Sequence, residues 1–159
     1  MAVMTAREGL SFRTRIASDT APLHGLVAAL LDTCPGLRAL RDPTRGGVAT
    51  TLNEFARSSQ VGIRIEHDAV PVRDDVRGAC EVLGIDPLYV ANEGKLVAVV
   101  PADEAAAAVV ALRNHEIGRE ATIIGEVSAA HPGIVSLCTA LGTERIVDMP
   151  VGEQLPRIC

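Results

Sequence analysis

The segment Arg-Asp-Pro-Thr-Arg-Gly-Gly-Val at residues 41–48 separates two apolar patterns with different periods. Residues 37–40, just before it, form a brief apolar run that predicts a strand. After the two glycines, apolar side chains recur at helical spacing, at Val48, Leu52, Phe55 and Ala56. This spacing predicts an amphipathic helix. The segment therefore lies where a strand ends and the N-terminus of a helix begins.

Such a junction is a ready anion-binding site, because free backbone N–H groups and the positive end of the helix dipole meet there. Gly46 and Gly47 let a phosphate approach the backbone closely, and Arg45 offers a bidentate contact. Thr44 offers a hydroxyl donor, and Asp42 offers oxygen ligands for Mg²⁺. A plain capped turn is the alternative, with Asp42 or Thr44 as N-cap and an Asp42–Arg45 surface pair.

The remaining patterns alternate between helices and strands. We expect helices at 23–31 (with caps at residues 18–20 and Pro22 near its first turn), at 71–83 and at 101–113. We expect strands at 61–66, 95–100, 121–127, 134–138 and 145–147, of which 95–100 reads as central and buried. The pattern predicts an α+β fold, with a mixed sheet of about four to six strands covered by helices on at least one face.

The segment Ala-Asn-Glu-Gly-Lys at residues 91–95 forms a turn at the start of the expected buried strand. As turn chemistry, Asn92 and Gly94 tolerate positive φ and Glu93 is only solvated. As active-site chemistry, Glu93 is a carboxylate held at a rigid strand edge, where it can act as a base. The turn alone does not decide between the two.

The chain ends in Pro-Arg-Ile-Cys at residues 156–159. Chain ends fray unless they are tied down, so the thiol of Cys159 is expected to move and to reach solvent. A mobile, accessible thiol is a candidate nucleophile once deprotonated. An arbitrary chain end is the alternative.

Composition narrows the classes of function. The net charge is −5, no basic run is present and aromatic residues make up 2% of the chain, which argues against nucleic-acid binding. No apolar stretch approaches the roughly 20 residues that span a bilayer, so no membrane partner is expected. Cys34, Cys80 and Cys138 read as small core residues, and a reducing cytoplasm fits the cysteine pattern.

Taken together, the segments at 41–54, 91–95 and 156–159 resemble the C-terminal domain of the HypE family of hydrogenase maturation proteins. This family belongs to the superfamily of aminoimidazole ribonucleotide (AIR) synthetase, selenophosphate synthetase and thiamine-monophosphate kinase. The resemblance covers essentially the whole chain. It implies that Cys159 accepts a carbamoyl group from the carbamoyltransferase HypF. The thiocarboxamide is then dehydrated with ATP to a thiocyanate, and HypC–HypD takes the cyanide for the iron of [NiFe] hydrogenase.

The resemblance also implies roles for individual residues. Cys159 becomes the modified and catalytic thiol, and Glu93 the base or the holder of its water relay. ATP and phosphate contacts fall on Asp42, Thr44, Arg45, Gly46, Gly47 and Asn92. By analogy with the kinase, Asp42 is a Mg²⁺ ligand. Arg45 stands where that kinase has a second aspartate, so we expect a phosphate contact there in place of a metal contact.

The family also carries an N-terminal domain with most of the ATP and Mg²⁺ groups and most of the homodimer contacts, and nothing in this sequence matches it. We therefore expect residues 1–150 to form an AIR synthetase-like C-terminal domain, residues 151–159 to form a flexible tail, and the chain alone to be inactive. The competing hypothesis is a docking and carrier module that presents Cys159 to HypF or HypC–HypD without catalysis. A thiamine-monophosphate kinase is disfavoured, because that sibling needs no terminal cysteine.

Overall fold

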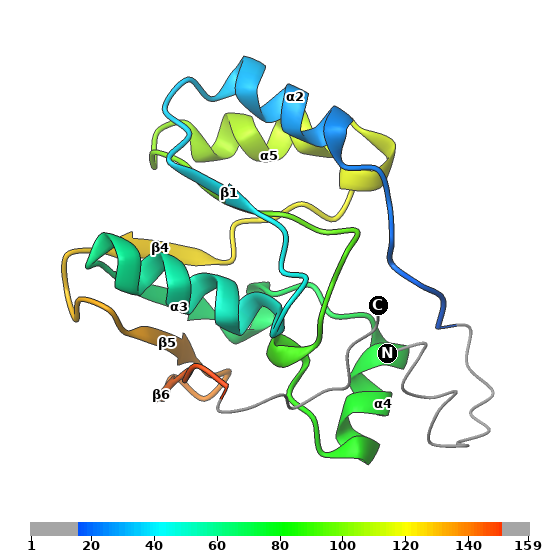
Figure 1. The fold of residues 1–159 in the computed structure, drawn as a ribbon, viewed down its shortest axis with the longest axis vertical. Coiled ribbons are helices and arrows are strands. Elements are labelled where there is room, and N and C mark those ends of the chain that lie inside the picture. Colours follow the sequence, from blue (N-terminus) through cyan, green and yellow to red (C-terminus); the bar gives the residue numbers. More distant parts are fainter. Residues whose placement is uncertain (1–15, 151–159) are drawn as a thin grey trace.

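The structure is a computed structural model and describes residues 16–150 of the chain. Its helices are α2 (His24–Thr33), α3 (Gly47–Ser59), α4 (Asp74–Leu83) and α5 (Ala105–Arg113). Its strands are β1 (Ala39–Arg41), β2 (Gly62–Glu66), β3 (Val97–Val99), β4 (Gly125–Ser128), β5 (Val135–Cys138) and β6 (Glu144–Ile146). Three short 3₁₀ turns complete the described chain, η1 (His67–Ala69), η2 (Pro87–Tyr89) and η3 (Glu116–Gly118). Figure 1 shows α2 and α5 together at one end of the molecule, with α3 and α4 toward the other.

The strands form two sheets. One has the order β4-β2-β5-β6, in which β2 and β5 are parallel and the other pairs antiparallel. The other consists of β1 and β3, paired antiparallel. The α+β class and a mixed sheet of the expected size are thus confirmed, whereas the second, two-stranded sheet was not predicted. The central position expected for 95–100 was wrong, because within residues 16–150 β3 pairs only with β1 and stays half-buried.

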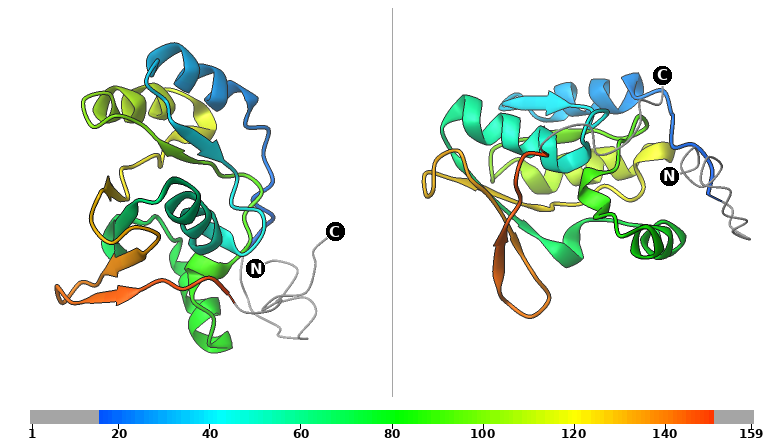
Figure 2. Two further views of the ribbon diagram at one scale, coloured as in Figure 1. Left: turned by 60° about the vertical axis from the view of Figure 1, so that its left-hand side comes forward. Right: turned by 60° about the horizontal axis from the view of Figure 1, so that its bottom comes forward.

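Each sheet has its own apolar core. Helix α3 covers the four-stranded sheet, and side chains such as Leu52, Ile65 and Leu137 fill the space between them. Helices α2 and α5 cover the two-stranded sheet, where Leu30, Cys34 and Ala108 are buried. Figure 2 shows these two helix-on-sheet units stacked next to each other. Among the helices of the described part, none is long and apolar enough to cross a membrane.

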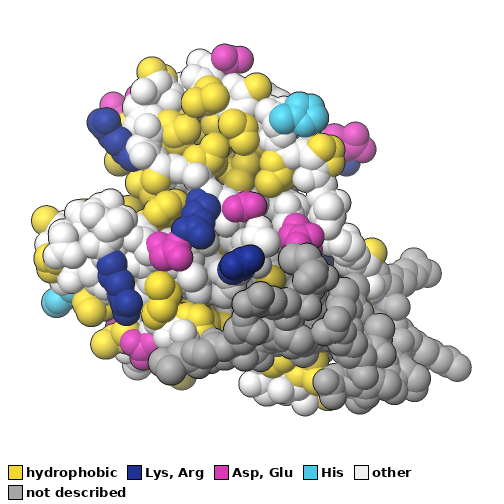
Figure 3. Space-filling model, in the orientation of Figure 1, with side chains coloured by type: hydrophobic (Ala, Val, Ile, Leu, Met, Phe, Trp, Pro, Cys, Tyr) yellow, Lys and Arg dark blue, Asp and Glu magenta, His cyan; other side chains and the backbone are white. Residues whose placement is uncertain are grey.

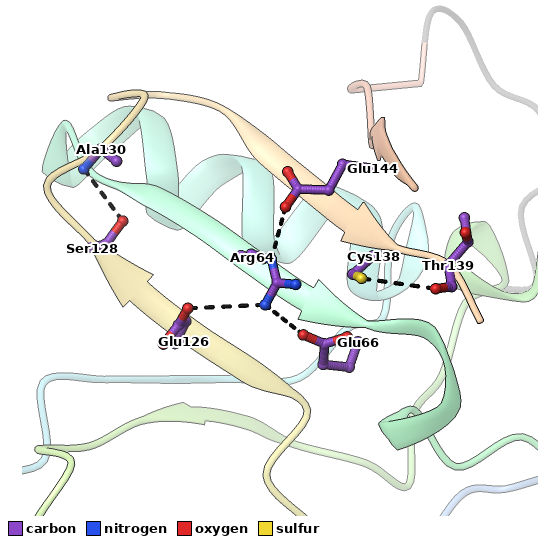
Figure 4. A network of polar contacts seen from close by, with 8 residues as sticks. All are labelled: Arg64, Glu66, Glu126, Ser128, Ala130, Cys138, Thr139 and Glu144. Carbon is purple, nitrogen blue, oxygen red and sulfur yellow. Dashed lines mark hydrogen bonds and ion pairs between the residues drawn. The ribbon is translucent and has the colours of Figure 1, made fainter. Parts of the chain in front are cut away.

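Local patterns place most of the elements correctly. In β2 the alternating side chains Ile63 and Ile65 are buried, whereas Arg64 points to the opposite face. Figure 4 shows this opposite face, on which Arg64 forms ion pairs with Glu66, Glu126 and Glu144. A sheet face that carries side chains of both charges is typical of a face exposed to solvent.

Several element ends differ from the prediction. Helix α2 begins at His24 without a side-chain cap, so the capping role expected for residues 18–20 was wrong. Helices α4 and α5 begin at Asp74 and Ala105, three and four residues later than expected. Residues 102–104 form a turn before α5, whereas residues 71–73 have no regular structure. Strand β4 begins only at Gly125, four residues after the predicted start.

Candidate functional site

The connection from β1 to α3 is a tight loop with a left-handed backbone at its end. Gly46 and Gly47 have φ values of 65° and 66°, and Gly46 is the N-cap of α3. The Thr44 hydroxyl donates to the Asp42 carboxylate at 2.9 Å, so neither side chain caps the helix. The prediction that a strand runs into a helix N-terminus is confirmed, whereas the alternative of an Asp42 or Thr44 cap is not.

Gly47 has a packing reason to be a glycine. A Cβ at this position would overlap the carbonyl oxygen of Leu88 and lie 2.7 Å from that of Val90, because η2 passes directly against the start of α3. This contact accounts for Gly47 without any phosphate. The free N–H groups of α3 and the exposed Arg45, which makes no hydrogen bond or ion pair with residues 16–150, remain the elements of an anion site.

One backbone hydrogen bond joins the two segments that the sequence singled out. The N–H of Asn92 donates to the carbonyl of Pro43 at 3.1 Å. The Asn92 side chain donates to the carbonyl of Val90 at 2.6 Å, which fixes the turn before β3. The 41–48 and 91–95 segments therefore form one continuous surface. In Figure 3, acidic and basic side chains gather across the middle of the same face, where β1 runs into α3 in Figure 1.

Glu93 is held by a residue that lies 73 positions earlier in the chain. The Thr20 hydroxyl donates to the Oε2 atom of Glu93 at 3.1 Å. Next to it, the Lys95 ammonium pairs with Asp19 at 2.9 Å, and the Asp19 carbonyl lies so close to Gly94 that a Cβ there would overlap it. The sequence pattern indicated helix capping for residues 18–20, and no local signal could reveal a partner this far along the chain.

The chain after β6 returns to this surface. The buried side chain of Asn53 donates to the carbonyls of Ala49 at 2.9 Å and Val147 at 2.8 Å, and so ties the returning chain to α3. The Tyr89 hydroxyl donates to the Asp148 carbonyl at 2.9 Å. Pro150 then lies next to Gly46, with its Cγ 3.4 Å from where a Cβ of Gly46 would be. Residues 151–159, including Cys159, lie outside the described residues.

The described residues partly fit Mg²⁺. Asp42 is an exposed carboxylate, but residues 16–150 contain no group of three or more His, Cys, Asp or Glu side chains placed to hold a metal. Mg²⁺ commonly takes only one or two carboxylates and completes its shell with water and phosphate. Asp42 therefore fits a single ligand to an ion held mainly by other groups. Arg45 supplies no metal-binding atom.

Of the candidate residues, Asp42 and Arg45 are exposed, whereas Glu93 is half-buried and Gly47 is buried against η2. The structure contains a cavity of about 220 Å³ elsewhere, between α4, η2 and the β5–β6 hairpin, with Arg77, Cys80 and Arg145 in its lining. None of the predicted site residues that the structure describes lines this cavity. Asp42, Arg45 and Glu93 are thus brought to neighbouring segments but are not enclosed by the described part of the chain.

The described thiols are poor nucleophiles. Cys34 and Cys80 are buried, and desolvation raises the pKa of both thiols. Desolvation and the neighbouring Glu66 likewise raise the pKa of Cys138, which is half-buried. A raised pKa leaves less thiolate at neutral pH, and the thiolate is the reactive form. Their prediction as core residues is confirmed for Cys34 and Cys80.

The Asp19–Lys95 pair makes a testable contribution to stability. Partial burial alone would raise the pKa of Asp19, but Lys95 and the backbone N–H groups of Asp19 and Glu93 outweigh it, so the net shift is downward. A lowered pKa stabilises the fold above the unfolded-state pKa, and this contribution is lost as the pH falls through the folded value.

Asp19→Asn is therefore expected to reduce the free energy of unfolding at pH 6, by less than about 1 kcal/mol because the pair is partly exposed. The difference from the wild type should be smaller at pH 3, because the contribution fades as the pH falls toward the lowered pKa of Asp19. Urea unfolding of both proteins at the two pH values measures it. Asp32→Asn is the control, because Asp32 is exposed and forms no ion pair with residues 16–150. A deficit for Asp19→Asn that is as large at pH 3 as at pH 6 would contradict the assignment.

The comparisons with known proteins agree with this fold. The chain belongs to the family described as AIR synthase related protein, C-terminal domain, whose model matches residues 2–137. It is 55% identical over 157 residues to the carbamoyl dehydratase HypE of Azotobacter vinelandii, an alignment that covers 99% of this chain and 46% of that protein.

Solved structures give the same result. A crystal structure of the hydrogenase maturation protein HypE matches with a TM-score of 0.92 and 47% identity, over 99% of this chain and 51% of that one. The match to HypE in complex with ATP has a TM-score of 0.91 and 46% identity, over 99% and 48% of the two chains. The match to the HypE–HypF complex has a TM-score of 0.88 and 49% identity, and it covers 93% of this chain and 48% of that one. The chain thus spans about half the length of these relatives.

Proposed function

We propose that this chain is the C-terminal half of an ATP-dependent carbamoyl dehydratase that carries its substrate on Cys159. The observation that carries the proposal is the meeting of three segments at the start of α3. The Asn92–Pro43 hydrogen bond joins the two loops, and Pro150, nine residues before Cys159, lies against Gly46. The similarity to carbamoyl dehydratases over 99% of the chain supports the same activity.

The proposed chemistry requires the Cys159 sulfur to react at two sites, first on HypF and then in its own active site. The Cys159 thiol first loses its proton and attacks the carbonyl carbon of the carbamoyl group that HypF has activated. The bond from that carbon to its activating phosphate group breaks, the phosphate group leaves, and an S-carbamoyl cysteine remains. The amide oxygen is a poor leaving group, so the terminal phosphoryl group of ATP is transferred to it as one N–H proton is lost. Loss of the second N–H proton then expels phosphate and leaves S–C≡N, with ADP and phosphate as the other products. In this proposal, Glu93 accepts one of these protons.

The residues around the start of α3 fit the phosphate end of this reaction. Arg45 and the N–H groups of Gly46 and Gly47 would stabilise phosphate charge, and Asn92 and Thr44 would add polar contacts. Asp42 would supply one oxygen ligand to Mg²⁺, an ion that neutralises phosphate charge when bound. Because these groups lie on an open surface, we expect the rest of the site to come from an N-terminal half such as the one the relatives have. This chain alone should therefore turn over little or no ATP.

Partners follow from the same proposal. HypF is the expected carbamoyl donor, in line with the solved HypE–HypF complex. HypC–HypD is the expected acceptor of the cyanide, and a homodimer is expected once the N-terminal half is present. A reducing cytoplasm suits a carrier that depends on a free thiol.

The test uses a fusion protein in which the first half of the Azotobacter vinelandii relative precedes this chain. The fusion protein is incubated with HypF, carbamoyl phosphate and ATP, and the terminal peptide is followed by mass spectrometry. We expect a mass gain of one carbamoyl group on the peptide that carries Cys159, followed by the loss of one water. The Cys159→Ala variant should show neither change while keeping its fold. No adduct on the wild-type peptide would refute the proposal.

The open surface around Asp42, Arg45 and Glu93 also favours a second candidate, the non-catalytic carrier module. The same experiment separates the two, because a carrier module gains the carbamoyl group but never loses water in the presence of ATP. ATP hydrolysis by the fusion protein gives an independent reading.

A further inference from the structure

The segment of residues 18–20 passes directly over the loop that carries Glu93. We propose that Thr20 is a positioning residue for Glu93, holding one carboxylate oxygen so that the other faces the substrate, and that Asp19 locks the same loop. This inference rests on the proposed function, because it assumes that Glu93 accepts a proton.

The hydroxyl groups of Ser18 and Thr20 donate in sequence toward Glu93. The Thr20 hydroxyl has one proton, and it donates that proton to the Oε2 atom of Glu93 at 3.1 Å. The contact between the Ser18 and Thr20 hydroxyls, at 2.9 Å, must therefore have Ser18 as the donor. Ser18 also accepts a hydrogen bond from the Thr20 N–H at 3.3 Å. The hydroxyls thus form a short chain that ends on Glu93, and such chains strengthen each of their bonds.

The loop around Glu93 is fixed on both sides. On one side, the N–H of Asn92 bonds to Pro43. On the other, Lys95 pairs with Asp19, and the Asp19 carbonyl lies against Gly94 where no side chain would fit. These contacts come from two segments distant in sequence and converge on one four-residue loop. The loop that carries Glu93 is therefore held in place by two segments that lie far from it in the sequence.

The two oxygens of Glu93 differ in their surroundings. Oε2 accepts the Thr20 hydrogen bond, whereas Oε1 accepts none from any group in residues 16–150. Glu93 is only half-buried, and a long carboxylate side chain at such a site has several rotamers open to it. A bond to one oxygen selects a rotamer and leaves the other oxygen available to a substrate N–H. Positioning of this kind is worth large factors in rate, because a base must lie within hydrogen-bond reach of its proton.

The experiment compares Thr20→Val and Thr20→Ser in the fusion protein. Valine keeps the shape of threonine but removes the hydroxyl, whereas serine keeps the hydroxyl. The protein is incubated with HypF, carbamoyl phosphate and saturating ATP, and mass spectrometry of the terminal peptide follows over time the carbamoyl adduct and its single-turnover conversion to thiocyanate, so that the two rates are read separately. We expect Thr20→Val to slow this single-turnover step by about tenfold and to leave the rate of carbamoylation unchanged. Thr20→Ser should restore the step to within about twofold of the wild-type rate.

Thr143→Val is the matched control, because Thr143 also shares a hydroxyl–hydroxyl contact, 2.7 Å from Thr139, far from the 91–95 loop in the sequence. It should leave both steps unchanged. Equal slowing by Thr20→Val and Thr20→Ser would overturn the inference, as would equal slowing of carbamoylation and dehydration, which indicates general damage. Glu93→Gln separates the two levels of the argument. If Glu93→Gln blocks dehydration and Thr20→Val does not, the positioning role fails and the proposed function stands. If Glu93→Gln dehydrates at the wild-type rate, the role of Glu93 itself is wrong.

Discussion

Glu93→Gln in the fusion protein is expected to stop thiocyanate formation while Cys159 still accepts its carbamoyl group. A glutamine cannot accept the proton, and loss of a general base commonly costs about 10²- to 10⁴-fold in rate. The amide oxygen of glutamine can still accept the Thr20 hydrogen bond, so the loop geometry should survive the change. Mass spectrometry of the terminal peptide over time gives the result directly, as an adduct that accumulates and does not lose water.

Glu116→Gln is the control for this prediction. Glu116 is exposed on η3, outside the loops that meet at the start of α3, and its replacement removes the same charge from the protein. This variant should dehydrate the carbamoyl group at the wild-type rate. Normal dehydration by Glu93→Gln would show that the base lies elsewhere, and equal inhibition by both variants would mean that net charge, rather than Glu93, governs the step.

Gly47→Ala is expected to produce the largest loss of stability of any single change in the loop. Alanine disfavours the φ of 66° by about 1–2 kcal/mol. Its Cβ would also overlap the Leu88 carbonyl and lie 2.7 Å from the Val90 carbonyl. Both obstacles are backbone atoms, which cannot rotate away, and overpacking of this kind typically costs a further 1–3 kcal/mol or so. We therefore expect a loss of about 2–5 kcal/mol in the free energy of unfolding, measured by urea denaturation.

Gly84→Ala separates the two causes. Gly84 ends α4 with a φ of 64°, nearly the same as that of Gly47, and a Cβ there would meet nothing within 4 Å. This variant should show only the conformational cost, about 1–2 kcal/mol. Equal losses at both positions would mean that η2 does not press against the start of α3 in solution.

The sequence correctly predicts those elements and loops that depend on the period of the apolar residues or on local turn residues. The repeat from Val48 to Ala56 locates α3, and the alternation of Ile63 and Ile65 locates β2, because each pattern reports which face of one element is buried. The glycine pair marks the loop correctly, since positive φ is a local property of the backbone. The residue types at Asp42 and Asn92 likewise mark both loops that the Asn92–Pro43 hydrogen bond joins.

Long-range partners decide the parts that the sequence missed. The apolar run around β3 indicates burial but not which strand pairs with it. The sequence therefore predicts a central strand, whereas β3 lies in a two-stranded sheet with β1. Residues 18–20 have the composition of a helix cap, and only the fold brings Thr20 to Glu93 and Asp19 to Lys95. The division of six strands between two sheets has the same origin, since pairing depends on topology rather than on any strand's own residues.

Asn53 and Tyr89 anchor the chain after β6, and this anchoring limits how far Cys159 can lie from the start of α3. It fixes Pro150 beside Gly46, and nine residues can carry Cys159 no farther than about 30 Å from that point. A sphere of this radius that holds a single sulfur corresponds to a local concentration on the order of ten millimolar. Under the proposed function, the return of a carbamoylated Cys159 to the start of α3 would thus be an intramolecular encounter, whose rate does not depend on how much of the protein a cell contains.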